Sequence, residues 1–259
     1  MRLVTWNVNS LKARMPRVLE FLELHAPDVV CLQETKTGPE AFPEDELRAA
    51  GYEAAHHSGG RWAGVAVLAR TGLGIEDVVC GLPGEAQADQ ARWVEATVAG
   101  IRVASVYVVN GQAVGTEPFA EKLAFLEAMS TRAATLRDAG APIVIAGDMN
   151  VCPTDTDVYD PAAFAGATHV TSEERGALAA VAHAGDLQDA YRTVHPEPSQ
   201  QFTWWDYRAG HFHKGLGLRI DLALVSEAIA SSLTDVRIER DFRKGHKPSD
   251  HVPLVAEWS

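Results

Sequence analysis

Side chains that can bind a cation or activate water stand at the ends of short apolar runs along this chain. The residues concerned are Asn7, Asn9, Glu34, Asp148, Asn150, Asp250 and His251. In a layered α/β protein, strand ends converge on one edge, where reactive side chains gather. Hard cations such as Mg²⁺ favour oxygen-rich pockets of this kind. The sequence therefore predicts one pocket, built from distant segments, that binds a divalent cation.

Glu34 follows an apolar run, 29–32, whose composition predicts a buried strand. Burial of an unpaired charge is costly, so this carboxylate needs a cation or a basic partner. A salt bridge to Lys36 or Arg61 and a bound cation are both consistent with the sequence.

Asn7 and Asn9 alternate onto one face of the first predicted strand, 3–9. Two carboxamides near a strand end can orient a carboxylate or bind a metal-linked water. Polar residues on an ordinary edge strand would give the same pattern, so Asn7 alone decides nothing.

The segment 147–150 gives a sharper signal. Gly147 allows a tight backbone turn, after which Asp148 and Asn150 can point at one site. The same spacing opens a calcium-binding loop, which is the competing interpretation. Pro153 and Tyr159 exclude it, because that loop needs a glycine and a bidentate glutamate at these positions.

Asp250 and His251 combine a hard ligand with a group that can donate to a phosphoryl oxygen or move a proton near neutral pH. A histidine in that role usually needs an orienting acceptor, and Asp221 is the best candidate. The alternative is an Asp221–Arg219 ion pair, although neighbouring residues on a strand point to opposite faces. Tyr107, considered alone, is typical of a core residue.

Size and composition predict one large domain, residues 1–259. The chain has 46% hydrophobic and 22% charged residues, and no apolar run reaches the length of a membrane span. The N-terminus has no secretory pattern, and the three cysteines lack metal-type spacing. We therefore expect a cytoplasmic protein with reduced thiols and no membrane contact.

The formal net charge is −12, which argues against a broadly basic nucleic-acid-binding surface. Positive charge is dense only in the segment 240–247, which contains Arg243 and Lys244. That segment alone would predict no more than an exposed loop. Its position just before Asp250 and His251 favours contact with phosphate, so we expect a narrow basic strip.

Strand-like and helix-like segments alternate only in part of the chain. Helical periodicity is clearest at 11–24 and 118–137, and a third helix is predicted to begin near Thr171, which has capping-box spacing with Glu174. Strands are predicted at 3–9, 28–33, 62–69, 92–98, 102–109, 142–146, 219–225, 236–239 and 252–258. Because several strands follow one another directly, the pattern favours an α/β fold with packed mixed sheets and outer helices.

Other catalytic chemistries lack their motifs. The sequence has no G-x-S-x-G segment, no Walker-type glycine-rich loop and no zinc-type Cys/His spacing. The pairs His56–His57 and His211–His213 are most simply surface histidines.

Taken together, seven segments resemble the exodeoxyribonuclease III family of class II apurinic/apyrimidinic endonucleases, within the endonuclease/exonuclease/phosphatase superfamily. They occur in family order over nearly the whole chain, and their order makes the resemblance specific although each motif alone is weak. The segments are TWNVNSL at 5–11, LQETK at 32–36, YVVNG at 107–111, GDMN at 147–150, FTWWDYR at 202–208, LRID at 218–221 and PSDH at 248–251.

The resemblance implies a four-layer α/β sandwich of the DNase I-like type, with two packed mixed sheets flanked by helices. It also implies that Glu34 and Asp250 bind Mg²⁺, with Mn²⁺ as an alternative. Asn7 and Asn9 would complete or orient that cation site.

The resemblance further implies how the remaining residues act. Asp148 would align or deprotonate the attacking water, and Asn150 would help to hold it. Tyr107 and His251 would contact the scissile phosphate, with Asp221 orienting His251. Whether Asp148 or His251 takes the proton stays open at this point.

Asn110 would hold a neighbouring phosphate, and Trp204 would line a pocket for a deoxyribose without its base. Two departures from the family pattern concern these residues. Val109 stands where many relatives have proline, which predicts a less rigid Asn110 loop. Leu218 stands where some eukaryotic relatives have tryptophan, which leaves Trp204 as the pocket wall.

The implied activity is DNA repair by Mg²⁺-dependent hydrolysis of phosphodiesters. We expect incision 5′ to abasic sites in duplex DNA, with 3′-end trimming and 3′→5′ exonuclease activity, by a monomer that binds abasic sites or 3′ ends. Two alternatives are a phosphatase acting on inositol lipids or sphingomyelin and a non-catalytic, RNA-associated regulator. The segment 202–207 disfavours the first, and the retained acidic residues disfavour the second.

Overall fold

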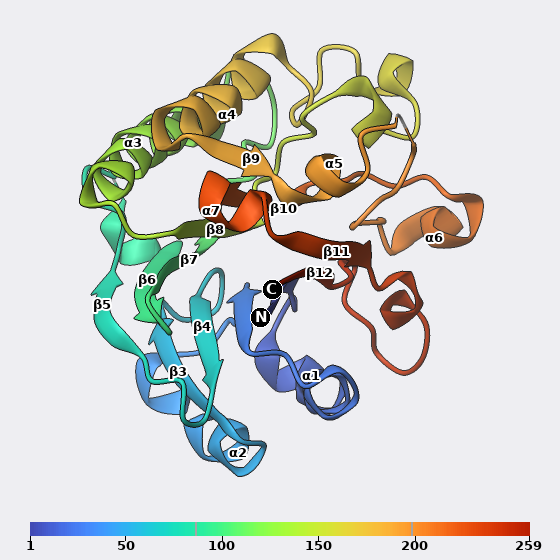
Figure 1. Cartoon of the computed structure of the whole chain (residues 1–259). Helices are drawn as coiled ribbons and strands as arrows, with labels where there is room; N and C mark the ends of the chain where they lie inside the picture. The colour runs from blue at the N-terminus through green and yellow to red at the C-terminus, as the bar shows by residue number, and fades with distance from the viewer. Residues whose placement is uncertain (86, 198) are drawn as a thin grey trace.

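Two six-stranded sheets face each other in the computed structural model, which describes residues 1–85, 87–197 and 199–259 (Figure 1). The first sheet has the order β11 (Leu233–Ile238), β12 (Leu254–Trp258), β1 (Arg2–Asn7), β2 (Val29–Gln33), β4 (Val65–Arg70) and β3 (Tyr52–His57). The second sheet has the order β5 (Glu76–Cys80), β6 (Trp93–Val98), β7 (Ile101–Tyr107), β8 (Ile143–Asp148), β10 (Asp221–Ser226) and β9 (Leu187–Asp189).

Each sheet is mixed, as the sequence predicted. The central pairs β1–β2 and β7–β8 are parallel. The pairs β1–β12, β2–β4, β6–β7 and β8–β10 are antiparallel. Each sheet therefore contributes one parallel pair whose carboxyl ends lie at the same edge.

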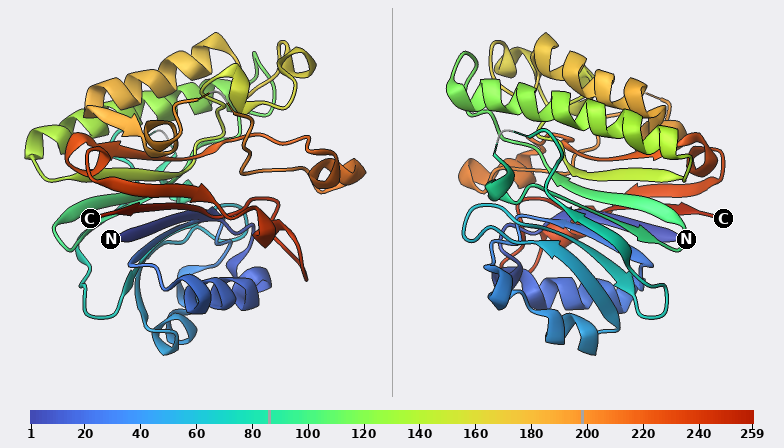
Figure 2. Two further views of the ribbon diagram at one scale, coloured as in Figure 1. Left: turned by 45° about the vertical axis from the view of Figure 1, so that its right-hand side comes forward. Right: turned by 90° about the vertical axis from the view of Figure 1, so that its left-hand side faces the viewer.

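Helices cover the outer face of each sheet, which gives four layers (Figure 2). Those against the first sheet are α1 (Leu11–His25) and α2 (Glu44–Ala49), and those against the second are α3 (Glu117–Ala139) and α4 (Ser172–Gly185). The shorter helices are α5 (Ala190–Val194), α6 (His211–Lys214) and α7 (Glu227–Ala230), with 3-10 turns at Pro39–Ala41, Ala88–Gln90, Asp155–Asp157, Pro161–Phe164, Arg208–Gly210 and Arg240–Arg243. The four-layer α/β sandwich is confirmed. None of the helices in the described part of the chain has both the length and the apolarity needed to span a membrane.

Three apolar clusters hold the layers together. One lies between the two sheets and includes Val29, Val67 and Val144. The second lies between the second sheet and α3 and α4, and the third between the first sheet and α1 and α2. Central strands are thus buried on both faces, which explains why β2, β4 and β8 read as continuous apolar runs.

The long helices and central strands were predicted closely. Thr171 and Glu174 form the predicted capping box at the start of α4. The strands β3, β5 and β9 were missed. β5 is largely exposed, β9 has three residues, and β3 has the sequence YEAAHH, which lacks β-branched residues.

Gly147 has a different role from the predicted tight turn. It lies within β8, pairs with Val106 and Leu222 on either side, and has no left-handed backbone angle. A Cβ atom at this position would lie 1.9 Å from the carbonyl oxygen of Val106. The glycine is needed because β7 approaches closely just before Asp148, not because the chain turns.

Replacing Gly147 with alanine should therefore push β7 and β8 apart and destabilise the fold by about 1–3 kcal/mol, as overpacking does. Urea denaturation measures the loss. Gly176→Ala in α4 is the matched control, because a Cβ there meets no atom within 4 Å. That control should be neutral or stabilising. Equal denaturation midpoints for Gly147→Ala and the parent would contradict this account of β8.

Candidate active site

The carboxyl ends of β1, β2, β7 and β8 meet at one edge, where a cavity of about 180 Å³ opens to the surface. Most of the site residues predicted from the sequence line it. The lining residues are Glu34, Tyr107, Asn110, Asp148, Asn150, His169, Trp204, Leu218, Ile220, Asp250 and His251. Three further predicted residues do not line the cavity but hydrogen-bond to residues that do: Asn7, Asn9 and Asp221. The remaining two, Arg243 and Lys244, line a second hollow.

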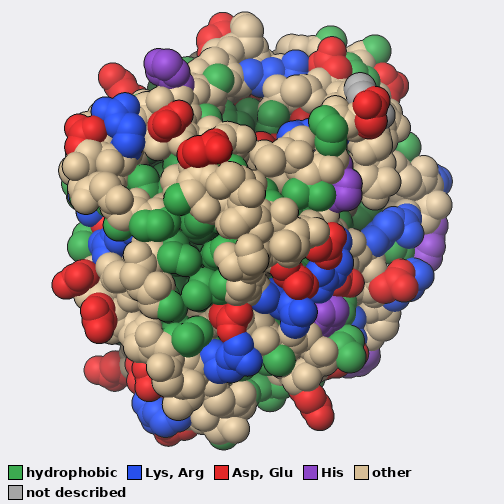
Figure 3. Space-filling view, viewed as in Figure 1, with side chains coloured by type: hydrophobic (Ala, Val, Ile, Leu, Met, Phe, Trp, Pro, Cys, Tyr) green, Lys and Arg blue, Asp and Glu red, His purple; other side chains and the backbone are tan. Residues whose placement is uncertain are grey.

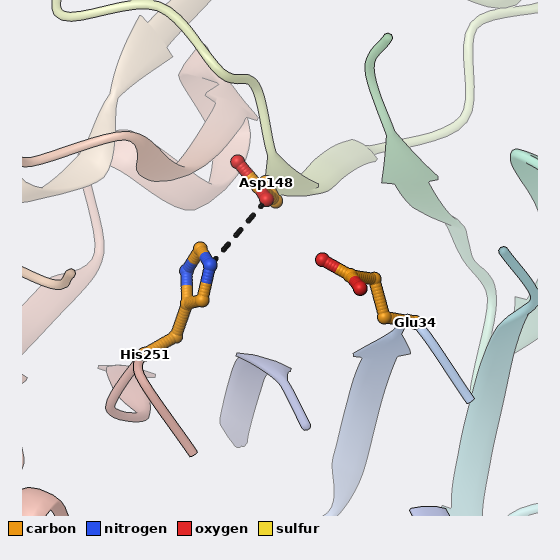
Figure 4. Close-up of side chains that lie close together, drawn as sticks. All are labelled: Glu34, Asp148 and His251. Carbon is orange, nitrogen blue, oxygen red and sulfur yellow. Dashed lines mark ion pairs between the residues drawn. The ribbon is translucent and has the colours of Figure 1, made fainter. Parts of the chain in front are cut away.

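Glu34, Asp148 and His251 form a compact group that can hold a cation (Figure 4). One ligand atom from each lies within 4.8 Å of the other two. The buried Asn7 amide donates to Glu34 Oε1 at 2.8 Å and to Asp148 Oδ2 at 2.9 Å. Asn7 thus holds the two carboxylates at a fixed spacing. The carboxylates of Glu34 and Asp148 offer the hard oxygen ligands that a divalent cation prefers.

Lys36 is the basic partner of Glu34 among the described residues, at 2.7 Å from Oε2. The same ammonium group donates to Asn9 Oδ1 at 2.6 Å, and the Asn9 amide donates to Asp250 Oδ1 at 3.0 Å. The salt bridge left open by the sequence therefore exists. It leaves Glu34 Oε1 directed at Asn7, towards Asp148.

Asp250 lines the same cavity but lies outside the compact group. Its second oxygen accepts a hydrogen bond from Trp204 Nε1 at 3.1 Å. Burial alone would raise the pKa of Asp250, but the charge of His251 and the hydrogen bonds from Asn9 and Trp204 lower it below its usual value. Asp250 is therefore ionised at neutral pH and faces the cavity as a carboxylate.

His251 is held between two carboxylates. Its Nδ1 lies 2.8 Å from Asp221 Oδ2, and its Nε2 lies 3.7 Å from Asp148 Oδ2. The predicted orienting partner is therefore in contact, whereas Arg219 pairs instead with Asp157 at 2.7 Å. The antiparallel register of β8 and β10 places Asp148 opposite Asp221, which explains how one imidazole reaches both.

The two central groups of the site shift each other's titration. Burial lowers the pKa of His251, but the charges of Asp221 and Asp148 outweigh it and raise the value to about 10. Burial, with the charges of Asp221 and Glu34, raises the pKa of Asp148 to about 7 against the opposing charge of His251. At neutral pH His251 is thus a cation and Asp148 is poised to gain or lose a proton.

Neutral donors also line the cavity. Asn110 Nδ2 donates to Asn150 Oδ1 at 3.2 Å, and the Asn150 amide donates to the carbonyl of Val108 at 2.9 Å. Burial and the charges of Glu34 and Asp148 raise the pKa of Tyr107 well above its usual value. Tyr107 therefore keeps its hydroxyl proton and can donate it in a hydrogen bond.

His169 and Ile220 line the cavity but were not predicted. His169 Nδ1 lies 2.5 Å from the carbonyl oxygen of Asn150. Burial and the charge of Lys122 lower the pKa of His169 to about 4, so the ring is neutral. A single loop histidine has no diagnostic spacing, and only its position two residues before the Thr171 capping box could have drawn attention to it.

Arg243 and Lys244, predicted to bind phosphate, lie beside a second hollow next to Tyr207 and Phe212. The Arg243 side chain is buried, with its guanidinium 4.7 Å from the Tyr207 ring centre, whereas Lys244 is exposed and pairs with Asp241 at 2.6 Å. On the face seen in Figure 3, basic and acidic side chains are interspersed. Phosphate contact by Arg243 and Lys244 stays a prediction.

Comparison with known proteins agrees with this fold. Residues 4–251 match the model of the endonuclease/exonuclease/phosphatase family. The chain is 32% identical to exodeoxyribonuclease III of Haemophilus influenzae over the whole of both chains. It superposes on a 3′ phosphatase from Neisseria, NExo, bound to a product DNA hairpin, with TM-score 0.96 and 38% identity, covering 100% of this chain and 99% of that one.

An AP endonuclease from Archaeoglobus fulgidus is also similar, with TM-score 0.94, 33% identity and coverage of 100% of this chain and 99% of that one. The protein belongs to the endonuclease/exonuclease/phosphatase family. Within that family it is a DNA repair nuclease of the exodeoxyribonuclease III type. The expected enzyme class is confirmed, and the lipid-phosphatase and non-catalytic alternatives are set aside.

Asp221→Asn should lower the pKa of His251, because it removes the charge that contributes most to raising it. The titration midpoint of the ring, followed by NMR in metal-free protein, should move down by about 1–3 pH units. In the parent, the raised pKa of His251 increases the free energy of unfolding. This contribution is fully present below about pH 6.5 and is lost as the pH rises through about 10. Asp138→Asn, which changes an exposed carboxylate on α3, is the control. An unmoved midpoint in Asp221→Asn would show that Asp221 does not govern the imidazole.

Proposed function

We propose that this nuclease hydrolyses phosphodiesters 5′ to abasic sites in duplex DNA, trims blocked 3′ ends and degrades DNA in the 3′→5′ direction. The observation that carries the proposal is the cavity in which Glu34, Asp148 and His251 face the neutral donors Tyr107 and Asn150. A phosphate bound there would meet the cationic His251, the donors Tyr107 and Asn150, and the cation that the carboxylates would hold. The activities in the names of the relatives, at abasic sites and at 3′ ends, support these substrates.

The cofactor in this proposal is Mg²⁺, with Mn²⁺ as an alternative. Glu34 and Asp250 would hold the cation, with Asn7 and Asn9 orienting them. Two observations support this cation: Glu34 and Asp250 line one cavity, and Glu34 lies close enough to Asp148 to help raise the pKa of that carboxyl group. Bound Mg²⁺ supplies charge neutralisation at the phosphoryl and leaving oxygens.

The protonation of the site supports the following acid–base roles. Asp148 takes the proton of the attacking water, because its pKa of about 7 leaves a basic form at neutral pH. His251 stays protonated and donates to a phosphoryl oxygen, with Asp221 fixing the ring through Nδ1. Tyr107 donates from its neutral hydroxyl, and Asn150 holds the water beside Asp148, whose Oδ1 accepts from the Asn150 backbone N–H at 3.0 Å.

Trp204, Leu218 and His169 form the wall against which a sugar would lie. A deoxyribose without its base has lost stacking and pairing, so it leaves the duplex at lower cost than an intact nucleotide. A 3′-terminal phosphate or sugar fragment presents a similarly small group. Both substrates therefore suit the same cavity, and Asn110 would bind the neighbouring phosphate.

Two further properties complete the proposal. We infer that residues 1–259 act as one domain and as a monomer, because the site combines side chains from Asn7 to His251 within this chain. A cytoplasmic location agrees with three free thiols, of which Cys31 and Cys152 are buried. Lys244 and Arg243 would contact phosphates flanking the site.

Asp148→Asn should reduce incision of a duplex with one tetrahydrofuran lesion, and removal of a 3′ phosphate, by several powers of ten, about 10³ or more, because it removes the proton acceptor. Product gels with Mg²⁺ and with EDTA measure both activities in one experiment, and EDTA should abolish both in the parent.

Asp138→Asn is the control and should retain full activity, since Asp138 is an exposed residue paired with Arg137. Cleavage by Asp148→Asn at near-parental rate in Mg²⁺ would refute the assigned role. Parental cleavage that persists in EDTA would refute the metal requirement.

A further inference from the structure

A buried lysine connects α3 to the two loops that carry Asn110 and Asn150. Lys122 has no exposed surface, and its ammonium group donates to the backbone carbonyl of Asn150 at 2.6 Å and to that of Asn110 at 3.2 Å. It also lies 3.3 Å from the hydroxyl of Thr168. Lys122 does not line the cavity, yet it contacts the backbone of two residues that do.

Glu174 supplies the counter-charge from α4. Its Oε1 pairs with Lys122 and accepts hydrogen bonds from Thr168 Oγ1 at 2.7 Å and the backbone N–H of His169 at 2.9 Å. Its Oε2 accepts from the backbone N–H of Thr171 at 3.1 Å in the capping box. The Glu174 carboxylate therefore both caps the N-terminus of α4 and neutralises the buried Lys122.

Burying this ion pair is expensive unless every donor and acceptor is satisfied. Well-packed apolar side chains often stabilise a protein as much as a buried ion pair does, so stability is a weak reason for a lysine at this position. What an apolar side chain could not do is donate hydrogen bonds to two carbonyl groups at once. The contacts of Lys122 are directed at the loops of the site.

The carbonyl of Asn150 is the point where these contacts converge. It accepts from Lys122 and faces His169 Nδ1, and the Asn150 backbone is left-handed, with φ of 50°. Such a conformation is unfavourable for a residue with a side chain and needs support from its surroundings. Fixing the carbonyl also fixes the direction of the Asn150 side chain, which accepts from Asn110.

The Asn110 loop is held in the same way. Gly111 has φ of +84°, and a Cβ there would meet Lys122 Cδ at 3.0 Å and Thr168 Oγ1 at 3.1 Å. Val109 leaves more backbone freedom before Asn110 than a proline would. The hydrogen bonds from Lys122 and Thr168 to the Asn110 carbonyl restrict this backbone.

We propose that Lys122, held by Glu174, is a positioning residue that sets Asn110 and Asn150 for the phosphates of the substrate. The inference rests on the proposed function, because it assigns these asparagines to substrate phosphate and attacking water. It predicts that loss of Lys122 acts on catalysis through Asn150, beyond any loss of stability.

The first test measures the loops directly and needs no substrate. Hydrogen–deuterium exchange of Lys122→Met should become faster in segments 108–113 and 149–152 while the central strands stay protected. Arg132→Met is the matched control, because Arg132 lies on the same helix and pairs with the buried Glu95, away from these loops. Unchanged exchange in both segments would overturn the proposal.

The second test is a double-mutant cycle on the kinetic constants. Lys122→Met should lower kcat by about 10- to 100-fold, as small misplacements of positioned groups do. In an Asn150→Ala background, the same change should lower kcat by less than about threefold, because the residue it positions is already gone. Arg132→Met should leave kcat within about twofold in both backgrounds.

Equal effects of Lys122→Met in both backgrounds would mean a purely structural role and overturn the inference. If Lys122→Met does not fold, Glu174→Gln replaces it, with the same exchange pattern and the same dependence on Asn150. A parental protein inactive on both DNA substrates would refute the proposed function, and the exchange experiment would still decide whether Lys122 holds the loops.

Discussion

The site depends on one hydrogen-bonded side chain that joins the two sheets. Asn7 lies at the end of β1 in the first sheet, and its amide donates both to Glu34 from the same sheet and to Asp148 from the second. The carboxylates of Glu34 and Asp148 repel each other, so they stay close only with the Asn7 amide hydrogen-bonded to both or with a cation beside them. Behind Asn7, Gln33 Nε2 donates to Ser105 Oγ at 3.0 Å and fixes the same relation between the sheets.

This arrangement explains why neighbouring carboxylates shift the pKa values of His251 and Asp148. Asp221 keeps His251 charged, while Glu34 and Asp221 make Asp148 a weaker acid. A fixed cation and a titratable carboxylate thus lie 3.7 Å apart between Oδ2 and Nε2. Preorganised charges of this kind need little rearrangement during a reaction. This low cost of reorganisation is the main source of electrostatic catalysis. The surrounding layers serve to keep that spacing constant.

Much of this could be predicted from the sequence, because strand ends and buried carboxylates leave local patterns. Glu34, Asp148 and His251 were each found from their position after or before an apolar run. The convergence of strand ends predicted their grouping, and the resemblance supplied their roles. What could not be predicted depends on contacts between distant segments. The close approach of β7 at Gly147 and the bonding of Lys122 to two carbonyls follow from the packing of elements, which no local pattern encodes.

The most direct test of the central claim is a crystal structure grown with Mn²⁺ and measured at the manganese absorption edge. We expect an anomalous peak in contact with the Glu34 carboxylate, inside the cavity that Asp148, Asp250 and His251 line. The peak should vanish in Glu34→Gln while the two sheets stay unchanged. Manganese bound only at surface carboxylates, or a cavity peak that survives that substitution, would contradict it.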